Sequence, residues 1–422
     1  MATLVSGRAA RPVKSIVLVN VIGEDRPGVT STVAEVLARH GALILDIGQA
    51  VIHDTLNLGI LAAVEEGRVC AAALEEVLSE VHRLGLQARI QPVAPERYQH
   101  WVEQQGRPRH IVTLLAPRIA AEHIARVAAV AAEGGLTIDT ISRLSGRIPL
   151  DRIDRRSKAC VEFSVRGAPL DAAAFRARLL ELAAELGVDL ACQEDDIFRR
   201  HRRLVAFDMD STLIEQEVID ELAREAGKGE EVARITEAAM RGELDFRESF
   251  ARRLALLAGL PEAALEVVAR RLRLTEGAEK LLATLRRLGY KTAILSGGFD
   301  YFGREIQRRL GIDYLYANHL DIAGGRLTGR VVGEVVDGPR KAELLQKLAE
   351  REGIRLEQTV AVGDGANDLP MLSIAGLGIA FRAKPLVRAS AKQAISTIGL
   401  DGVLYLMGIR DRDADGELVT PR

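Results

Sequence analysis

Hydrophobic and polar positions in the first quarter of the chain follow strand and helix periods in a fixed order. Strand patterns cover residues 16–21, 42–47, 56–64 and 87–93. One helix pattern ends near residue 41, and a second covers residues 71–84. The resulting order is strand, helix, strand, strand, helix, strand, which is the split βαβ arrangement. The pattern therefore predicts a small α+β, ferredoxin-like domain over residues 14–97.

The same order returns over residues 108–195. Strand patterns cover residues 110–115, 137–143, 159–165 and 188–193, and helix patterns cover 121–133 and 170–185. A repeat at this spacing indicates two modules in tandem. An arginine-rich segment at 146–157 interrupts the second module, and we expect it to be an exposed loop.

The second half of the chain contains apolar strand patterns that each end in small or polar residues. The patterns cover residues 204–207, 291–295 and 359–362. Open α/β sheets bind ligands at the carboxyl ends of their strands, so we expect the residues that follow these strands to share one site. Residues 215–275 have helical spacing and few strand signals, which predicts a small helical cap inserted after the first strand.

Asp208 and Asp210 follow the first of these strands. If the strand continued, side chains two residues apart would point the same way, and two carboxylates so close would need a cation or a shared proton. Mg²⁺ would satisfy them and leave one carboxylate oxygen free to attack. A strand end that runs into a solvated turn is the alternative for this motif taken alone.

Two later segments favour phosphate chemistry. Ser296-Gly297-Gly298 places a hydroxyl and closely approachable backbone N–H groups at a strand end. Lys341 follows a predicted helix start at Pro339 and could act as a fixed cation for a phosphate. Residues 363–368, with the sequence GDGAND, supply further oxygen ligands after the third strand.

The order DMDST, SGG, Lys341 and GDGAND resembles the haloacid dehalogenase superfamily of phosphotransferases, and within it the phosphoserine phosphatases. The resemblance covers residues 200–408 and implies an α/β fold with a Rossmann-like core and a cap. It implies that Asp208 is the nucleophile and that Asp210 is the general acid and base. The implied Mg²⁺ ligands are Asp208, the Asp210 backbone carbonyl and Asp364, supported by Asp368. The implied phosphate and substrate residues are Ser296, Gly297, Lys341, Asn367, Glu217, Arg253, Met240 and Phe246.

Glu217 and Arg253 decide the predicted substrate. A carboxylate and a guanidinium together would recognise the ammonium and carboxylate of free phosphoserine. Without the resemblance, Arg253 beside Arg252 is more typical of a helix surface. We therefore predict Mg²⁺-dependent hydrolysis of O-phospho-L-serine to L-serine and phosphate, the last step of serine biosynthesis. One alternative is phosphoryl transfer to another alcohol such as homoserine. A second alternative is a regulatory protein with an inactive catalytic half, but the complete set of motifs argues against it.

The two front modules resemble ACT domains, which are small-molecule regulatory modules. The turn Asp25-Arg26-Pro27-Gly28 matches the ligand loop of that family, and its backbone N–H groups at a helix start suit an amino-acid carboxylate. An ordinary βα turn is the alternative. The second module has residues 116–119 (APRI) at this place, so ligand binding by that copy is not expected. Serine inhibition through the first module and a homodimer are the expected consequences.

Composition limits the other possibilities. The 422 residues carry a formal net charge of −2, so no global field favours nucleic acid or anionic membranes. Three cysteines at unrelated spacings indicate neither a disulfide framework nor a metal site, which favours a reducing cytoplasm. We expect neither a signal peptide nor a membrane-spanning run. The arm at 1–14 and the tail after Arg410 have compositions typical of disorder.

Overall fold

The computed structural model describes residues 14–65, 68–147, 158–241 and 243–414. The chain divides into two compact units, and the boundary along the sequence lies between Arg107 and Pro108. Among the described residues, no helix is both long enough and apolar enough to cross a membrane. The arm at residues 1–13 and most of the arginine-rich segment, 148–157, lie outside the described residues.

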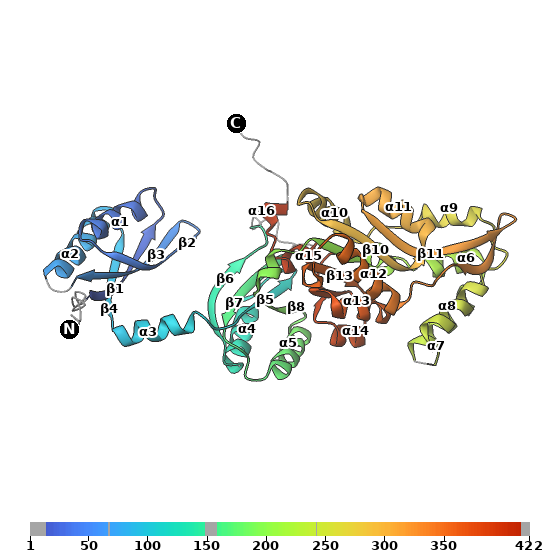
Figure 1. Cartoon of the computed structure of the whole chain (residues 1–422), viewed down its shortest axis with the longest axis horizontal. Helices are drawn as coiled ribbons and strands as arrows, with labels where there is room; N and C mark the ends of the chain where they lie inside the picture. The colour runs from blue at the N-terminus through green and yellow to red at the C-terminus, as the bar shows by residue number, and fades with distance from the viewer. Residues whose placement is uncertain (1–13, 66–67, 148–157, 242, 415–422) are drawn as a thin grey trace, which may run out of the picture. The chain divides into compact units, whose positions relative to one another are not determined.

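The first unit contains an antiparallel sheet in the order β2-β3-β1-β4 (Figure 1). Its elements are β1 (Lys14–Glu24), α1 (Val29–Arg39), β2 (Leu43–Ile52), β3 (Thr55–Glu65), α2 (Arg68–Arg83) and β4 (Gln87–Val93). Alternate strand residues such as Val19 and Ile60 form the core with Val33 and Val77 of the helices. The predicted element order is confirmed.

Helix α3 (Pro95–Gln104) ends the first unit and was not predicted. None of its residues is buried, and its apolar residues Tyr98, Trp101 and Val102, although spaced for one helix face, span little more than one turn. Pro95 lies in its first turn, where a proline fits a helix start.

The second unit begins with a sheet of the same topology, in the order β6-β7-β5-β8. Its elements are β5 (Arg109–Ala116), α4 (Ala121–Glu133), β6 (Thr137–Arg143), β7 (Ala159–Arg166), α5 (Ala172–Leu186) and β8 (Asp189–Glu194). Leu114 and Phe163 face the helices and share their core with Val127 and Leu179. The predicted repeat is therefore confirmed.

The rest of the second unit is built on a seven-stranded sheet in the order β12-β11-β10-β9-β13-β14-β15. The strands are β9 (Leu204–Phe207), β10 (Lys291–Phe299), β11 (Tyr314–Ala323), β12 (Arg326–Val332), β13 (Thr359–Gly363), β14 (Leu377–Phe381) and β15 (Gln393–Ile395). All neighbouring pairs are parallel except β11 and β12.

Helices cover both faces of this sheet because its strands are apolar on both sides. Val205 and Phe207 pack with α10 (Ala278–Arg287) and α11 (Asp300–Leu310). Leu204 and Ala206 pack with residues of the other face. The helices of that face are α12 (Gly338–Arg351), α13 (Leu369–Ile374) and α14 (Pro385–Ser390). The predicted Rossmann-like core is confirmed.

The segment after β9 forms the predicted helical cap. It contains α6 (Val218–Glu225), α7 (Gly229–Met240), α8 (Phe246–Ala255) and α9 (Ala263–Ala269). The chain enters and leaves the cap side by side, since Ile214 and Leu274 form an antiparallel bridge and Thr275 N donates to the Leu213 carbonyl.

The second ACT-like sheet docks on the core with the face that its own helices leave open. Leu115, Cys160 and Ala191 belong to the same apolar cluster as Tyr405 and Leu406 of α15 (Gly402–Leu406). This module is therefore an integral part of the catalytic unit.

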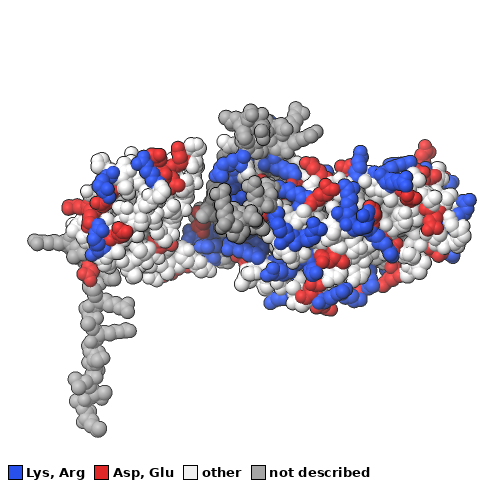
Figure 2. Space-filling view, turned by 90° about the horizontal axis from the view of Figure 1, so that it is seen from above, with Lys and Arg blue, Asp and Glu red and all other residues white. Residues whose placement is uncertain are grey.

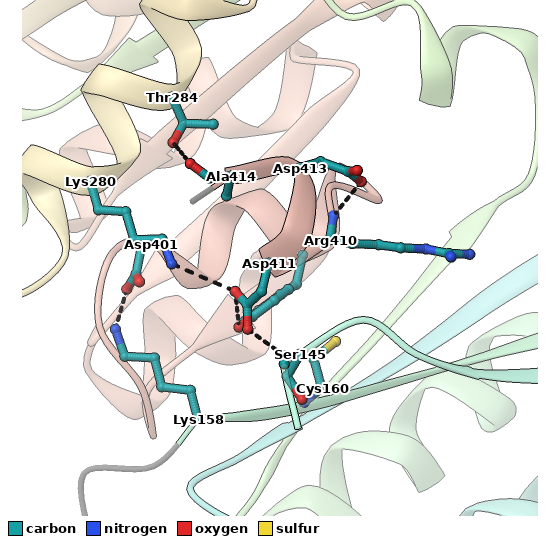
Figure 3. Close-up of polar contacts among 12 residues, drawn as sticks. Ser145, Lys158, Cys160, Lys280, Thr284, Asp401, Arg410, Asp411, Asp413 and Ala414 are labelled. Atoms are coloured by element: carbon teal, nitrogen blue, oxygen red, sulfur yellow. Dashed lines mark hydrogen bonds and ion pairs between the residues drawn. The ribbon is translucent and has the colours of Figure 1, made fainter. Parts of the chain in front are cut away.

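Polar contacts complete the docking interface, and they include the segment after Arg410. Lys158 pairs with Asp401 at 2.6 Å, and Lys280 approaches Asp411 at 3.6 Å (Figure 3). Asp411 also accepts from Gly146 N at 2.6 Å and begins α16 (Asp411–Ala414). The prediction of disorder directly after Arg410 is therefore wrong for residues 411–414, because the Asp411 carboxylate anchors them to the second module.

Charged side chains are mixed on the surface of the second unit. Lys and Arg lie among Asp and Glu over the part of that unit that is seen in Figure 2. This distribution agrees with the near-zero net charge and offers no broad single-sign field on that face.

Candidate active site

The predicted site residues converge at one edge of the seven-stranded sheet. Strands β10, β9 and β13 are neighbours and run parallel, so their carboxyl ends lie together. Asp208 follows β9, Ser296 lies in the last part of β10, and Asp364 follows β13. Lys341 reaches the same place from α12.

Asp208 and Asp210 face different groups. Strand β9 ends at Phe207, and both carboxylates follow its carboxyl end. Asp208 Oδ1 accepts from Lys341 Nζ at 2.9 Å and from Met209 N at 2.7 Å. Asp210 Oδ1 accepts from Val218 N, at the start of the cap, at 3.3 Å.

The environment of Asp210 favours its protonated form. Burial, followed by the charges of Glu217 and Asp208, raises the pKa of Asp210 well above its ordinary value. A carboxyl that holds a proton near neutral pH can act as a general acid.

Three carboxylates form a cluster beside Asp210. One oxygen each of Asp208, Asp364 and Asp368 lies within 4.8 Å of the others. Burial and then the charge of Asp208 raise the pKa of Asp364 to about 8 and that of Asp368 to about 7. Like charges held this close favour a bound cation, and carboxylate oxygens are ligands that suit Mg²⁺. These residues therefore fit a divalent metal ion.

Lys341 is completely buried and balances part of this negative charge. Its Nζ lies 2.7 Å from Asp368 and 2.9 Å from Asp208. Burial opposes its positive charge, but the two carboxylates outweigh that effect and raise the pKa of Lys341. Asp337 caps helix α12 by accepting from Arg340 N at 3.0 Å, which helps to hold Lys341 in place.

The loop Ser296-Gly297-Gly298 lines the opposite side of the site. Ser296 is fully buried, and its Oγ accepts from Gly298 N at 2.9 Å. A Cβ at Gly298 would lie 2.5 Å from Asp210 Oδ2, so only glycine fits there. A Cβ at Gly297 would lie 3.3 Å from Phe246 and 3.9 Å from Asn367 Nδ2, which places both side chains beside this loop.

The cap brings further predicted residues to the site. Glu217 accepts from Ser211 Oγ at 2.8 Å. Arg253 lies on α8, and its buried Nε has no hydrogen-bond partner among the described residues. Burial lowers the pKa of Arg253, whereas Glu217 and Asp220 act in the opposite direction. A buried, unpaired guanidinium N–H facing carboxylates fits a site for an anionic ligand group.

Phe246 and Met240 are the other two cap residues that were predicted to contact the substrate. Phe246 stacks on Phe250 with 6.0 Å between ring centroids, so it forms an apolar wall beside Gly297. Met240 ends α7, and its side chain lies outside the described part of the chain.

Asn318, a buried residue of β11, also belongs to the site and was not predicted from the sequence. Its Nδ2 donates to the Gly297 carbonyl at 2.8 Å, and its Oδ1 accepts from Val336 N at 2.9 Å. The available signal was a polar residue inside an apolar strand pattern, close in sequence to the phosphate-binding motifs.

The predicted regulatory loop lines a separate cavity in the first unit. Residues 25–31, with Gln49 and Leu56, enclose about 310 Å³. Gly28 has a φ of 97°, which favours glycine, and it precedes the first turn of α1. The first N–H groups of a helix have no partner within the helix, so a helix start at the cavity suits an anionic ligand group.

Comparison with known proteins is consistent with this division of the chain. Residues 205–373 match the haloacid dehalogenase-like hydrolase family, and residues 15–91 and 108–193 each match an ACT domain family.

Two curated relatives cover nearly the whole chain. A phosphoserine phosphatase of Streptomyces coelicolor is 43% identical over 399 residues, which are 94% of this chain and 93% of the relative. A phosphoserine phosphatase of Mycobacterium tuberculosis is 42% identical over 407 residues, which are 94% of each chain.

Two solved structures are also similar. A HAD-family hydrolase of Salmonella enterica has a TM-score of 0.59 and 31% identity, covering 73% of this chain and 100% of that one. An unliganded probable phosphoserine phosphatase of Vibrio cholerae has a TM-score of 0.56 and 34% identity, covering 72% and 88%.

Proposed function

Because the chain belongs to the phosphoserine phosphatase family of haloacid dehalogenase-like hydrolases, we propose that it hydrolyses O-phospho-L-serine to L-serine and phosphate. The observation that carries this proposal is the buried carboxylate of Asp208, held by Lys341 and surrounded by the phosphate loop and a second acid, Asp210.

The reaction proceeds in two displacements. Asp208 attacks phosphorus, the bond to the serine oxygen breaks, and Asp210 donates its proton to that oxygen. Asp210 then takes a proton from water, the resulting nucleophile attacks the aspartyl-phosphate, and phosphate leaves as Asp208 is regenerated. The raised pKa of Asp210 suits the first step, in which it must carry a proton.

Charge neutralisation supports both steps. Ser296 Oγ, the N–H of Gly297 and Lys341 bind the phosphoryl oxygens, on which negative charge spreads during transfer. Asn367 lies beside this loop and contributes a further polar contact. Asp208, Asp364 and the Asp210 backbone carbonyl would hold Mg²⁺, with Asp368 in support, and the bound ion would supply additional positive charge at the phosphoryl group.

Recognition of the serine portion falls to the cap. Arg253 pairs with the substrate carboxylate, Glu217 pairs with its ammonium group, and Phe246 and Met240 pack against it. The unpaired Nε of Arg253 supports this assignment, because an amino-acid carboxylate would complete its hydrogen bonding. Phosphoryl transfer to an alcohol such as homoserine is not favoured, because the full-length relatives described above are phosphatases.

Replacement of Asp208 tests the proposed reaction. Asp208→Asn should lower phosphate release from phosphoserine by at least about 10³-fold, since an amide is a poor nucleophile. Asp313→Asn is the matched control. The Asp313 carboxylate accepts a hydrogen bond from Thr292 N at 2.9 Å, near the amino end of β10 and away from the carboxyl ends that form the site. Phosphate release is measured with Mg²⁺ present, and full activity of Asp208→Asn would contradict the proposal.

The metabolic role and regulation extend this proposal. The enzyme would catalyse the last step of serine biosynthesis, and serine would bind the Asp25-Arg26-Pro27-Gly28 loop and inhibit. The cavity at this loop supports an amino-acid ligand. Serine is titrated against the full chain by calorimetry and in rate assays. Gly28→Ala, strained at a φ of 97°, should weaken inhibition and leave the active site intact. Absence of serine binding would refute this role.

A homodimer and a cytoplasmic location complete the proposal. Strand β2 lies at a sheet edge and exposes Leu43, Ile47 and Ile52 by 53%, 52% and 70%, which supports burial against a second copy. Light scattering measures the mass in solution, and a monomer at micromolar concentration would contradict a dimer. The proposed cytoplasmic location rests on the three cysteines, because their unrelated spacings indicate no disulfide framework and so favour a reducing compartment.

A further inference from the structure

We propose that Asn318 is a positioning residue for the phosphate-binding loop, which it joins to the segment that leads to Lys341. The inference rests on the proposed phosphatase function. Asn318 does not touch the reacting groups in this arrangement; it acts through the backbone of Gly297 and Val336.

The sheet itself leaves the phosphate-binding loop without support on this side. Strand β10 pairs with β11 from Ala293 to Leu295 and again at Phe299, which is opposite Asn318. The register shifts between Leu295 and Phe299, so Ser296-Gly297-Gly298 bulges out of the ladder. A buried carbonyl in such a bulge needs another partner, and the Asn318 side chain supplies it at Gly297.

Fixing the Gly297 carbonyl also fixes the neighbouring N–H. The peptide between Gly297 and Gly298 is planar, so an anchored carbonyl sets the direction of Gly298 N–H. That N–H donates to Ser296 Oγ at 2.9 Å. The hydroxyl therefore already accepts one hydrogen bond and can direct its own hydrogen to a phosphoryl oxygen. Two adjacent glycines have the widest conformational freedom, so this restraint is needed for a preorganised loop.

The second hydrogen bond connects the loop to the helix that carries Lys341. Asn318 Oδ1 accepts from Val336 N, one residue before Asp337, which caps α12. A Cβ at Gly297 would lie 3.4 Å from the Val336 carbonyl, so the two segments are in close contact. Asn318 is only 2% exposed, and both ends of its carboxamide are used. One side chain thus sets the relative position of the serine hydroxyl and the lysine.

Gln393 offers a matched control for the loss of a buried carboxamide. It is 6% exposed, accepts from Cys192 N at 3.0 Å and donates to the Cys192 carbonyl at 2.6 Å. It therefore makes the same kind of double backbone bridge, but between the core and the second ACT-like module.

Asn318→Ala and Gln393→Ala are compared by thermal unfolding, phosphoserine kinetics and calorimetric binding of vanadate, a mimic of the transferring phosphoryl group. Both should lower the melting temperature. Asn318→Ala should lower kcat/KM and vanadate affinity by about tenfold or more, because preorganised donors are lost. Gln393→Ala should keep both within about twofold of the wild type.

Asn318→Asp tests the same role independently of Asn318→Ala, and it keeps the proposal testable if Asn318→Ala fails to fold. At pH 8 its carboxylate keeps the bond to Val336 N but opposes the Gly297 carbonyl, so activity should fall at least as far as in Asn318→Ala. When protonated, it can donate to that carbonyl. Its activity relative to the wild type should therefore recover as the pH falls toward 5.

The outcomes separate the two proposals. Wild-type protein that does not hydrolyse phosphoserine would refute the proposed function, whereas vanadate binding would still test Asn318. Wild-type-like kcat/KM and vanadate affinity in the Asn318 variants would overturn the positioning role. Equal catalytic losses in the Asn318 and Gln393 variants would overturn it as well, since they would indicate a general effect of destabilisation.

Discussion

Replacing Asp364 by asparagine is expected to stabilise the metal-free protein at pH 8 and to abolish most of its response to Mg²⁺. Asp364 lies in the carboxylate cluster with Asp208 and Asp368, and its pKa is about 8 against 3.8 for the free side chain. Below pH 4 the carboxyl is protonated in the folded and unfolded states alike, so the substitution has no electrostatic effect there.

The sign of the effect follows from proton binding. Between pH 4 and 8 the unfolded chain has released this proton while the folded protein retains it, so stability falls as the pH rises. At about 1.36 kcal/mol per pH unit, the cost for an isolated group approaches roughly 5 kcal/mol at pH 8. Solvent access and relaxation of Asp208 and Asp368 reduce this cost, and we expect Asp364→Asn to recover about 2 kcal/mol. This gain corresponds to a melting temperature about 5 °C higher.

Calorimetric unfolding in a chelating buffer at pH 4, 6 and 8 measures this effect, and added Mg²⁺ should then raise the melting temperature of the wild type far more than that of the variant. Asp313→Asn serves as the control. Asp313 is held by Thr292 and Lys291, and its pKa is lowered, so this change should destabilise at pH 8 and leave the Mg²⁺ response unchanged. If Asp364→Asn is no more stable than the wild type at pH 8 without metal, the predicted cost of the Asp364 charge is refuted.

Substitutions at three further positions test other parts of the second unit. Arg253→Ala should raise KM for phosphoserine about tenfold or more and leave hydrolysis of p-nitrophenyl phosphate nearly unchanged; equal losses on both substrates would contradict its role in recognition. Asp337→Ala should cost about 1–2 kcal/mol in thermal unfolding, because α12 loses its cap. Asp337→Asn can keep the cap and loses the ion pair and hydrogen bond to the exposed Arg247, so it should cost less, about 0.5–1 kcal/mol. Asp189→Ala should lower the stability by about 2–4 kcal/mol and leave KM unchanged. The buried Asp189 carboxylate accepts from the backbone N–H groups of Ser396 and Thr397 at 2.8 Å each. Unchanged stability would contradict its role in docking the second module.

Local patterns were sufficient for most of the fold. Strand β4 was predicted with its observed bounds because polar and apolar residues alternate along most of it. Strand β6 was also predicted with its observed bounds, although a register shift between Ile138 and Thr140 interrupts its alternation. Helix α3 was missed because its apolar spacing spans little more than one turn. The bulge in β10 was also beyond reach, since the residues that leave the ladder are identified only by their neighbours on β11.

The site shows the same division between local and tertiary information. The positions of Asp208, Ser296 and Asp364 at three strand ends were predictable because parallel strands order their carboxyl ends along one edge. Their surroundings were not predictable in this way. The strand ends before Asp208, Asp210 turns toward the cap, and Asn318 enters from a strand with no recognised motif.

The element order, the tandem modules and the residue types of the catalytic edge could be predicted from the spacing of nearby positions. The docking of the second module through its open sheet face and the bridge from the serine loop to the lysine helix through Asn318 became evident from the fold alone. Raised pKa values, buried unpaired groups and bridging hydrogen bonds all depend on distances between segments remote in the chain. No local pattern records those distances.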